Sequence, residues 1–563
     1  MTNLSSATNG SAKDIIEPFV RIVSIGGTGM FGMNCLLLET QNTRIMIDAG
    51  VMFPADDDFG VDLITPDFSI VENNPPAALF VTHAHEDHIG AIPYLLMALL
   101  KHGFKKKLPI YASDFTVALI KRRLEEHELL GKVEFNIIRP KQIIKLNDIQ
   151  IECISVCHSI PGSMAFAIET PVGTIVHSGD WRIDNTPMAG AKTNLARFES
   201  LGDNGVRLFL SDSTNVEVDN SDITSELDVF NDIQTCIKQA QGRVFVTLFA
   251  SNIGRLQSIL YAAANTGRKL AICGRSMFSN LNIARELDYL KLPPNLEIIK
   301  EEDISSADDN LVIVVAGSQG EKTASLFKIA KGEHPRIKLR KTDTLLYSAR
   351  QIPGNERRIT AIINGFYRQG ASLINRPDLT LHSSGHGNQR ELELLIELIA
   401  PEIFVPIHGD HRRLFLHEEL AKRQENKMIT EILDEGQCMM IFKDRHEIRD
   451  GYMPSRRYVV GKCFDGIDRE LAKEKKNIAH QGVLTISGVL NSDDVLVGDL
   501  CVHPLGICVN DGWYDELVPE LIRTINSSAH HGDMADIVRH KAAKYIKNAI
   551  GRFPTIVVDF HRI

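Results

Sequence analysis

Short apolar runs recur along this chain and are separated by segments with helical periodicity. Runs of strand length occur at 20–25, 77–81, 149–154, 243–249, 269–273 and 311–315. Apolar positions spaced as on one face of a helix occur at 89–100, 253–264 and 389–399. Strands that alternate with helices in this way are typical of α/β proteins, so we expect an α/β fold.

The segment 34–48 predicts a β-hairpin, because two strand-like runs flank a turn at 40–42. Just before it, Gly27-Thr-Gly29-Met-Phe-Gly32 satisfies the G-x-G-x-x-G pattern of dinucleotide-binding folds, and Asp48 lies near the distance of a ribose-binding acid. Such a fold needs a helix that begins at the glycines, and the hairpin argues against one. We therefore expect these glycines to form a tight turn that leads into the hairpin.

Composition is that of a large globular chain and does not select a function. The 563 residues are 44% apolar and 24% charged, which suits three or more domains. The net charge of −10 argues weakly against a nucleic-acid partner. Nine scattered cysteines suit a reducing compartment, and the apolar runs are far shorter than a membrane span. We expect a cytoplasmic protein with no membrane association and a flexible arm at 1–15.

The segment His83-Ala-His85-Glu-Asp87-His88 places three imidazoles and a carboxylate within six residues. It follows the strand-like run 77–81 and precedes the helical segment 89–100, so it lies on a strand-to-helix turn. His83 and His85 are two apart and point to the same side, whereas Asp87 and His88 diverge toward a second position. A lone histidine is usually structural, but this cluster predicts a pair of divalent metal ions.

The cluster resembles the second motif of the metallo-β-lactamase superfamily. That resemblance implies an αββα sandwich and further metal ligands at the ends of later strands, for which the sequence offers His158, Asp180 and His408. His158 would join His83 and His85, His408 would join Asp87 and His88, and Asp180 would bridge both ions. Asp48 is expected to orient the imidazoles. Nitrogen and oxygen ligands without cysteine suit zinc, and the carboxylates leave manganese as the alternative.

The long stretch between Asp180 and His408 predicts an inserted domain, since a compact sandwich needs far fewer residues there. It resembles the β-CASP insertion of the nucleic-acid-processing branch of the superfamily. His408 favours RNA within that branch, because the DNA-acting relatives tend to carry Val at this place. Eight segments narrow the resemblance to the RNase J family of bacterial ribonucleases: 47–54, 81–90, 158–161, 211–215, 249–253, 316–321, 352–356 and 382–387.

The resemblance implies a domain order for the whole chain. The metallo-β-lactamase domain would span 16–213 and 366–445, and the β-CASP domain would span 214–365. A linker at 446–458 would lead to a small α/β C-terminal domain at 459–563. That last region has strand-like runs at 482–490 and 555–560 and a charged helix near 535–550.

The resemblance also implies a catalytic and a binding set. Asp87 and Asp180 would act with the metals, and His386 would be the proton donor or charge stabiliser for the departing 3′ oxygen. The 5′ monophosphate of RNA would lie in a pocket whose residues are Ser251, Asn252, His382, Ser384, Gly385 and His386.

A phosphate pocket one nucleotide from the metals would make the enzyme a 5′→3′ exonuclease that prefers a 5′ monophosphate. Endonucleolytic cleavage is also known in the family, and both activities would serve RNA maturation and decay. The expected partners are single-stranded RNA, further copies of this chain in a dimer or tetramer, and other RNA-decay proteins.

Some residues depart from the family pattern. Gly254 replaces a histidine that usually faces RNA, and Met30-Phe31-Gly32 replaces an acidic-Ile-Gly turn. The family's acidic partner of His386 is not evident, and Glu226 is the candidate.

Two other functions are compatible with the fold. One is a metallo-β-lactamase-fold hydrolase that acts on a thioester or a small phosphodiester; the large insertion and Ser383-Ser-Gly-His386 argue against it. The other is a non-catalytic RNA-binding protein, and the complete set of ligand positions argues against that.

Overall fold

A computed structural model describes residues 17–54, 60–219, 224–304, 308–352, 354–374, 379–424, 428–461, 464, 469–507, 512–527 and 533–563. The expected arm at 1–15 lies outside the described residues. The chain forms two compact units, Met1–Met52 with Thr65–Ser455, and Phe53–Ile64 with Arg456–Ile563.

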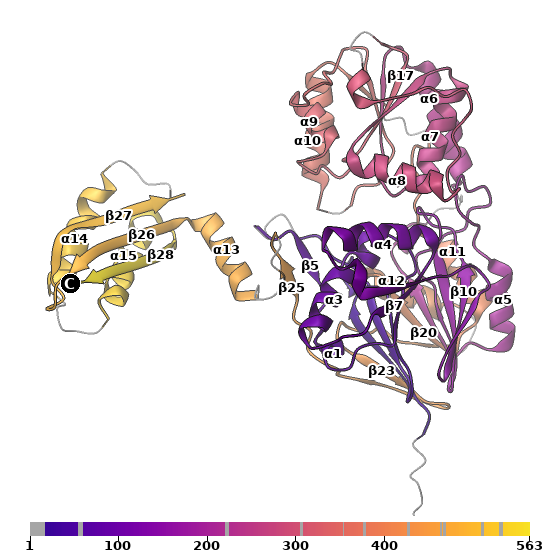
Figure 1. Ribbon diagram of the computed structural model, residues 1–563, viewed down its shortest axis with the longest axis horizontal. Helices are drawn as coiled ribbons and strands as arrows, with labels where there is room; N and C mark the ends of the chain where they lie inside the picture. The colour runs from indigo at the N-terminus through magenta and orange to yellow at the C-terminus, as the bar shows by residue number, and fades with distance from the viewer. Residues whose placement is uncertain are drawn as a thin grey trace, which may run out of the picture. The chain divides into compact units, whose positions relative to one another are not determined.

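Two sheets packed face to face form the centre of the first unit (Figure 1). The eight-stranded sheet has the order β24 (His446–Arg449), β23 (Cys438–Ile441), β1 (Val20–Gly26), β3 (Cys35–Glu39), β4 (Arg44–Ile47), β6 (Ala78–Phe80), β7 (Leu108–Ala112) and β8 (Val133–Ile137). The seven-stranded sheet has the order β22 (Ile429–Thr430), β20 (Ile403–Ile407), β13 (Leu208–Asp212), β12 (Gly173–His177), β11 (Met164–Thr170), β10 (Ile149–Ser155) and β9 (Ile143–Leu146). Apolar side chains from both, such as Leu38, Phe80 and Phe166, interdigitate between them.

Helices cover the outer faces and complete the predicted αββα sandwich. The eight-stranded sheet is accompanied by α1 (Ser69–Glu72), α3 (Ile92–Lys101) and α4 (Asp114–Glu126) (Figure 1). The outer face of the seven-stranded sheet packs on α5 (Leu195–Asn204), α11 (Gln389–Ile399) and α12 (His411–Lys422). Phe198, Leu395 and Leu420 from these three helices contact Phe209 and Phe404 of the sheet in one apolar cluster.

The predicted hairpin at 34–48 is confirmed. Strands β3 and β4 pair antiparallel with Leu37 opposite Met46, so no helix follows the glycines and a dinucleotide-binding fold is excluded. Gly27 and Gly29 have φ values of 88° and 75°, in the left-handed region that favours glycine. Their turn forms β2 (Thr28–Gly29), which pairs with β21 (Gly409–Asp410) beside the predicted ligand His408.

The inserted domain contains a six-stranded parallel sheet. Its order is β16 (Ile298–Ile299), β15 (Lys269–Cys273), β17 (Leu311–Val315), β14 (Val244–Thr247), β18 (Thr344–Tyr347) and β19 (Ser372–Ile374). Helices α6 (Glu226–Gln239), α7 (Ile253–Asn265), α8 (Arg275–Glu286), α9 (Ser325–Lys331) and α10 (Glu356–Arg368) alternate with the strands. Strand β19 lies beyond residue 365, where this domain was expected to end, because it pairs with β18.

The second unit contains the C-terminal strands and helices. Its sheet has the order β27 (Leu496–Leu505), β26 (Val483–Leu490) and β28 (Thr555–Arg562), and α14 (Trp513–Ser527) and α15 (Met534–Ile550) pack on one face. Helix α13 (Arg469–Gln481) precedes the sheet, and β25 (Arg457–Val459) pairs with β5 (Leu63–Thr65). Strand β24 belongs to the large sheet, so the first unit continues into the expected linker at 446–458. Among the described helices, none has the length and apolar character of a membrane span.

Candidate metal centre

The histidine-rich turn lies between β6 and α2 (Glu86–Ile89), with His85 as the residue that precedes the helix. This confirms the predicted strand-to-helix turn. The single helix predicted at 89–100 is wrong, because α2 ends at Ile89 and α3 begins at Ile92. Pro93 lacks the N–H that a continuous helix would bond to the carbonyl of Ile89, which accounts for the break.

The segment that follows β4 forms backbone hydrogen bonds with this turn. The backbone N–H of Ala49 donates to the carbonyl of His88 at 2.8 Å, and the N–H of Val51 donates to the carbonyl of Glu86 at 3.0 Å. Between them, Gly50 is so close that a Cβ there would lie 1.6 Å from the carbonyl oxygen of Asp87. The predicted ligands therefore depend on a glycine for a steric reason.

The first group of possible ligands comprises His83, His85, His158 and Asp180, whose donor atoms all lie within 4.8 Å of one another. His85 Nδ1 is 3.0 Å from His83 Nε2 and 3.1 Å from His158 Nε2. Asp180 Oδ2 lies 3.5 Å from His83 Nε2. The predicted partners of the first metal are thus close enough to bind one ion.

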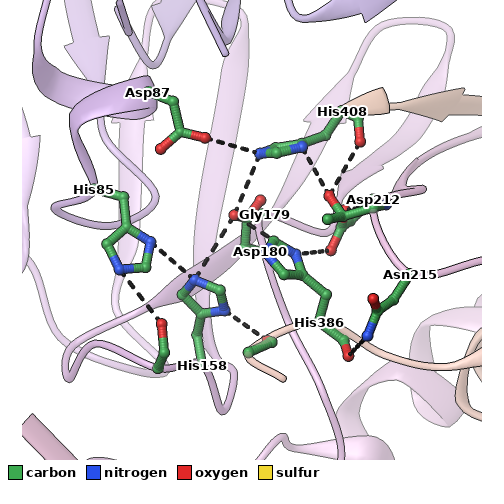
Figure 2. Close-up of polar contacts among 12 residues, drawn as sticks. His85, Asp87, His158, Gly179, Asp180, Asp212, Asn215, His386 and His408 are labelled. Carbon is green, nitrogen blue, oxygen red and sulfur yellow. Dashed lines mark hydrogen bonds and ion pairs between the residues drawn. The ribbon is translucent and has the colours of Figure 1, made fainter. Parts of the chain in front are cut away.

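Asp87, His88 and His408 form the second group. His408 Nε2 lies 3.3 Å from Asp87 Oδ2, and His88 Nε2 lies 3.7 Å from the same oxygen. Asp180 Oδ2 is 3.4 Å from the Nε2 atoms of both His88 and His408. Figure 2 shows Asp180 between His158 of the first group and His408 of the second, the position of a bridging carboxylate.

Hydrogen bonds at the far nitrogen fix three of these imidazoles. His88 Nδ1 donates to Asp48 Oδ2 at 2.7 Å, the contact expected of a residue that orients this imidazole. His158 Nδ1 donates to the carbonyl of Gly385 at 2.6 Å. His408 Nδ1 lies 2.9 Å from Thr214 Oγ1, whose hydroxyl donates to the carbonyl of His408. Each of these bonds leaves Nε2 directed at the centre.

The donor set fits divalent metal ions. His408 Nε2 is buried and faces the carboxylates of Asp87 and Asp180 at 3.3 and 3.4 Å without a well-aligned hydrogen bond, so a cation among these atoms would satisfy all three. Burial lowers the pKa of His83 and of His158 well below the ordinary value, so both remain neutral, the form that binds metals. Nitrogen and carboxylate donors in two groups that share Asp180 suit two ions.

The sheet topology brings the later residues together. Strands β12, β13 and β20 run parallel, so their carboxyl ends lie at one edge, and Asp180, Asp212 and His408 follow or end them. His386, on the loop before α11, places Nδ1 2.7 Å from Asp212 Oδ2 and 3.9 Å from Asp180 Oδ2 (Figure 2). Burial lowers the pKa of His386, but the carboxylates of Asp212 and Asp180 together outweigh burial, and the pKa lies above its ordinary value.

Asp212, and not Glu226, is therefore the acidic partner of His386, and the sequence-based candidate is wrong. Glu226 forms a bidentate ion pair with Arg255, with distances of 2.9 and 2.8 Å, and accepts a hydrogen bond from Ser383 Oγ at 2.5 Å. The sequence contained a signal for Asp212, because this residue lies at the end of an apolar strand, as Asp180 and His408 do.

A small cavity beside the first ligand group contains part of the predicted phosphate pocket. Asn252 and Ser384 line it together with His158, Arg182 and Gly254. The other four predicted residues, Ser251, His382, Gly385 and His386, are outside the lining, although Gly385 and His386 directly follow Ser384.

Sequence reasoning missed Arg182, a buried residue whose guanidinium donates to the carbonyl of Ser384 at 2.8 Å. At Gly254 a Cβ would meet its nearest neighbours only at 3.8 Å, so the cavity has free space on that side.

Family models match three segments of the chain. "Ribonuclease J, beta-CASP domain" matches residues 241–366, "Beta-lactamase superfamily domain" matches residues 43–198, and "Zn-dependent metallo-hydrolase RNA specificity domain" matches residues 380–431. The first covers most of the inserted parallel sheet, and the last includes His386 and His408.

Curated relatives are similar over most of their length. Ribonuclease J of Helicobacter pylori is 36% identical, over 96% of this chain and 79% of its own. Ribonuclease J 1 of Streptococcus pyogenes is 35% identical over 88% and 87%, and ribonuclease J of Thermus thermophilus is 32% identical over 96% and 95%. A solved structure of a protein of unknown function from Enterococcus faecalis has a TM-score of 0.54 at 15% identity, over 75% of this chain and 100% of that chain, which supports the fold alone.

Proposed function

Because the chain belongs to the ribonuclease J family and is a metal-dependent ribonuclease, we propose that it removes nucleotides one at a time from the 5′ end of RNA and also cleaves internally. The observation that carries this proposal is the convergence of two ligand groups on Asp180, with the His386–Asp212 pair beside them.

In this proposal His83, His85 and His158 would hold one ion, Asp87, His88 and His408 would hold the other, and the two groups would share Asp180. Zinc suits the imidazole-rich donor set, with manganese as the alternative. Two such ions, when bound, activate a water molecule and stabilise negative charge on the phosphate and the leaving oxygen. The chain's own residues then have to bind the RNA end, orient it and deliver a proton.

His386 is the proposed proton donor. Water adds to phosphorus and loses a proton to solvent, the bond between phosphorus and the 3′ oxygen breaks, and the electron pair leaves with that oxygen, which takes a proton from His386. His386 regains a proton from solvent before the next cycle. Asp212 holds the imidazole through Nδ1 and stabilises its protonated form. The products are a nucleotide with a free 3′ hydroxyl and a shortened RNA with a new 5′ monophosphate.

The proposed site for the 5′ monophosphate is the cavity next to His158. Asn252 and Ser384 offer an amide and a hydroxyl, and the buried guanidinium of Arg182, which is paired with Asp184, offers further N–H donors. Glu226, which also lines the cavity, has its charge balanced by Arg255. Ser251, Gly385 and His382 are proposed to complete the pocket when RNA is bound. Burial, with Arg255 nearby, lowers the pKa of His382 to about 3, so His382 would act as a neutral hydrogen-bonding group.

The finer predictions about partners remain proposals. Single-stranded RNA with a 5′ monophosphate is the proposed substrate, and a dimer or tetramer that works with other RNA-decay proteins is the proposed assembly. Free thiols such as Cys35, Cys153 and Cys438 support the predicted cytoplasmic location, because a reducing compartment preserves them.

The test is a time course with a single-stranded RNA that is labelled at its 5′ end and bears either a monophosphate or a triphosphate, in the presence of Mn²⁺ or Zn²⁺. Immediate release of labelled mononucleotide from the monophosphate form alone is the expected result. Longer labelled fragments from both forms would leave only the endonuclease. Intact RNA under all conditions, equal to an Asp87→Ala control, would refute the proposal.

A further inference from the structure

The loop that carries His386 is held by both domains of the first unit. From the metallo-β-lactamase side, Arg182 donates to the carbonyl of Ser384. From the inserted domain, Ser348 Oγ donates to the carbonyl of Leu381 at 2.6 Å, and Arg255 donates to the same oxygen at 3.1 Å. The place of His386 over the metal ligands thus depends on the inserted domain as well as on the sandwich.

A further connection leads directly to His386. Asn215, buried three residues after Asp212, donates from Nδ2 to the backbone carbonyl of His386 at 3.0 Å (Figure 2). The opposite atom of the same amide, Oδ1, accepts a hydrogen bond from the guanidinium of Arg350. Asp212 therefore fixes the ring of His386, and Asn215 fixes its backbone.

Arg350 and the His386 carbonyl together orient the Asn215 amide. A guanidinium can only donate hydrogen bonds and a carbonyl can only accept them, so the amide oxygen points toward Arg350 and the amide nitrogen toward His386. Without Arg350 the amide oxygen loses its donor, and the amide is held at one end only.

The backbone of Arg350 is held in place, although the residue is exposed. It follows β18 in the inserted domain, and its backbone carbonyl accepts a hydrogen bond from Gln319 Nε2 at 2.9 Å. Gln319 also accepts the backbone N–H of Ile352 at 2.9 Å. The nearby carboxylate of Glu217 is paired with Arg412 and Arg413, at 2.9 and 2.6 Å. Asn215 is thus the residue that Arg350 contacts with its guanidinium.

We propose that Arg350 is a positioning residue for the proton donor: acting through Asn215, it links the inserted domain to His386 and sets the aim of that imidazole at the leaving 3′ oxygen. This inference rests on the proposed function, in which His386 protonates that oxygen. It makes the chemical step, and not RNA binding, depend on a residue outside the metal-binding domain.

The experiment compares wild type with Arg350→Met, which keeps the aliphatic stem and removes every donor. Two 5′-monophosphorylated RNAs are used, one natural and one with sulfur in place of the 3′ oxygen of the first linkage. A thiolate leaves without protonation, so a proton donor that is out of place should matter little for the sulfur RNA. General acids contribute about a hundredfold or more, so partial misplacement should lower kcat on the natural RNA about tenfold with unchanged KM.

Asn215→Ala supplies the second arm, because a residue that acts through Asn215 has no further effect once Asn215 is gone. The double variant should therefore be no slower than Asn215→Ala alone. Tyr289→Phe is the matched control, since it removes another hydrogen bond between the two domains, from Tyr289 to Asp114 Oδ1 at 2.7 Å, without contact to His386. It should keep wild-type kcat on both RNAs.

Three results would overturn the inference: a rise in KM alone, which would make Arg350 a direct RNA contact; equal losses on both RNAs; or additive losses in the double variant. If Asn215→Ala does not fold, the rates of Arg350→Met on the two RNAs still test whether Arg350 acts on proton donation. Wild-type protein that releases no nucleotide from the natural RNA would instead refute the proposed function.

Discussion

The hydrogen bond from His386 to Asp212 meets two requirements that the proposed reaction places on His386. A proton donor must be protonated before the reaction and must face the leaving oxygen. The carboxylate at 2.7 Å raises the pKa of His386 against the effect of burial and also fixes its ring. At neutral pH this favours the imidazolium form.

A pH profile tests this assignment. Activity that needs protonated His386 is full below the pKa of His386 and falls as the pH rises through it. Asp212→Asn removes the charge that raises this pKa, so the alkaline fall in kcat should move to lower pH, and kcat at neutral pH should drop at least about tenfold. An alkaline limb at the same pH in wild type and Asp212→Asn would contradict the assignment.

The sequence predicted the proposed metal ligands better than it predicted the acidic partner of His386. The proposed ligands belong to short motifs at the ends of apolar strands, so local pattern and family resemblance were enough to bring them together. The partner of His386 depends on which strands are neighbours in the sheet. Asp212 meets His386 because β13 lies between β12 and β20, a fact of topology that no local spacing contains.

At the scale of elements, the contact between Gly50 and the ligand turn predicts a steric effect. Gly50→Ala would place a methyl group 1.6 Å from the Asp87 carbonyl, so the turn must move. We expect a loss of about 1–3 kcal/mol in unfolding free energy, together with less bound metal per chain. Thermal unfolding and metal analysis of the purified variant measure both effects.

Gly131→Ala is the control for that substitution, because a Cβ at Gly131 has no neighbour within 4 Å. It should change stability by no more than about 0.5 kcal/mol and leave the metal content unchanged. Equal metal content in Gly50→Ala and Gly131→Ala would show that the turn does not need glycine.

The buried pair of Glu226 on α6 and Arg255 on α7 predicts a pH-dependent contribution to stability. Burial raises the pKa of Glu226, but Arg255, with Arg182 and the hydrogen bond from Ser383, outweighs burial and lowers the pKa from 4.5 to about 2. The stabilisation is therefore fully present above 4.5 and is lost as the pH falls toward about 2. Glu226→Gln should cost about 3–5 kcal/mol at neutral pH, because it leaves a buried guanidinium without its charge partner.

Urea unfolding of wild type and Glu226→Gln over a range of pH measures this difference. The gap between the two proteins should narrow as the pH falls below about 4.5, where wild-type Glu226 begins to lose its charge. A gap that stays constant down to the acid limit would mean that the carboxylate charge is not what stabilises the pair.

Element limits were predictable where an apolar run decided them. Strands β15 and β17 and helix α11 have the predicted bounds, since the strands are buried apolar runs and the helix repeats apolar residues on one face after an Asn388 cap. The predicted domain boundaries differ from the structure where a strand forms only because it pairs with a strand that is distant in the sequence. Strands β19 and β24 are short, and they form because β18 and β23 offer open edges to them.

At the scale of the whole molecule, the predicted dimer or tetramer can be tested on the C-terminal sheet. Helices α14 and α15 pack on one face, and the other face exposes Leu505 and Val557, which are 61% and 48% accessible. Apolar side chains on an open sheet face are typical of assembly surfaces. We expect Leu505→Glu with Val557→Glu to reduce the mass measured by light scattering to that of a single chain. An unchanged oligomer would assign assembly to another surface.

The central claim is that the two ligand groups hold two catalytic ions that share Asp180. Titration of metal-free protein with Zn²⁺ or Mn²⁺, with bound metal and RNA hydrolysis measured in the same samples, tests it most directly. Hydrolysis should reach its plateau at two ions per chain, and Asp180→Ala should bind less metal and stay inactive. Full hydrolysis by metal-free protein, or a plateau at one ion per chain, would contradict it.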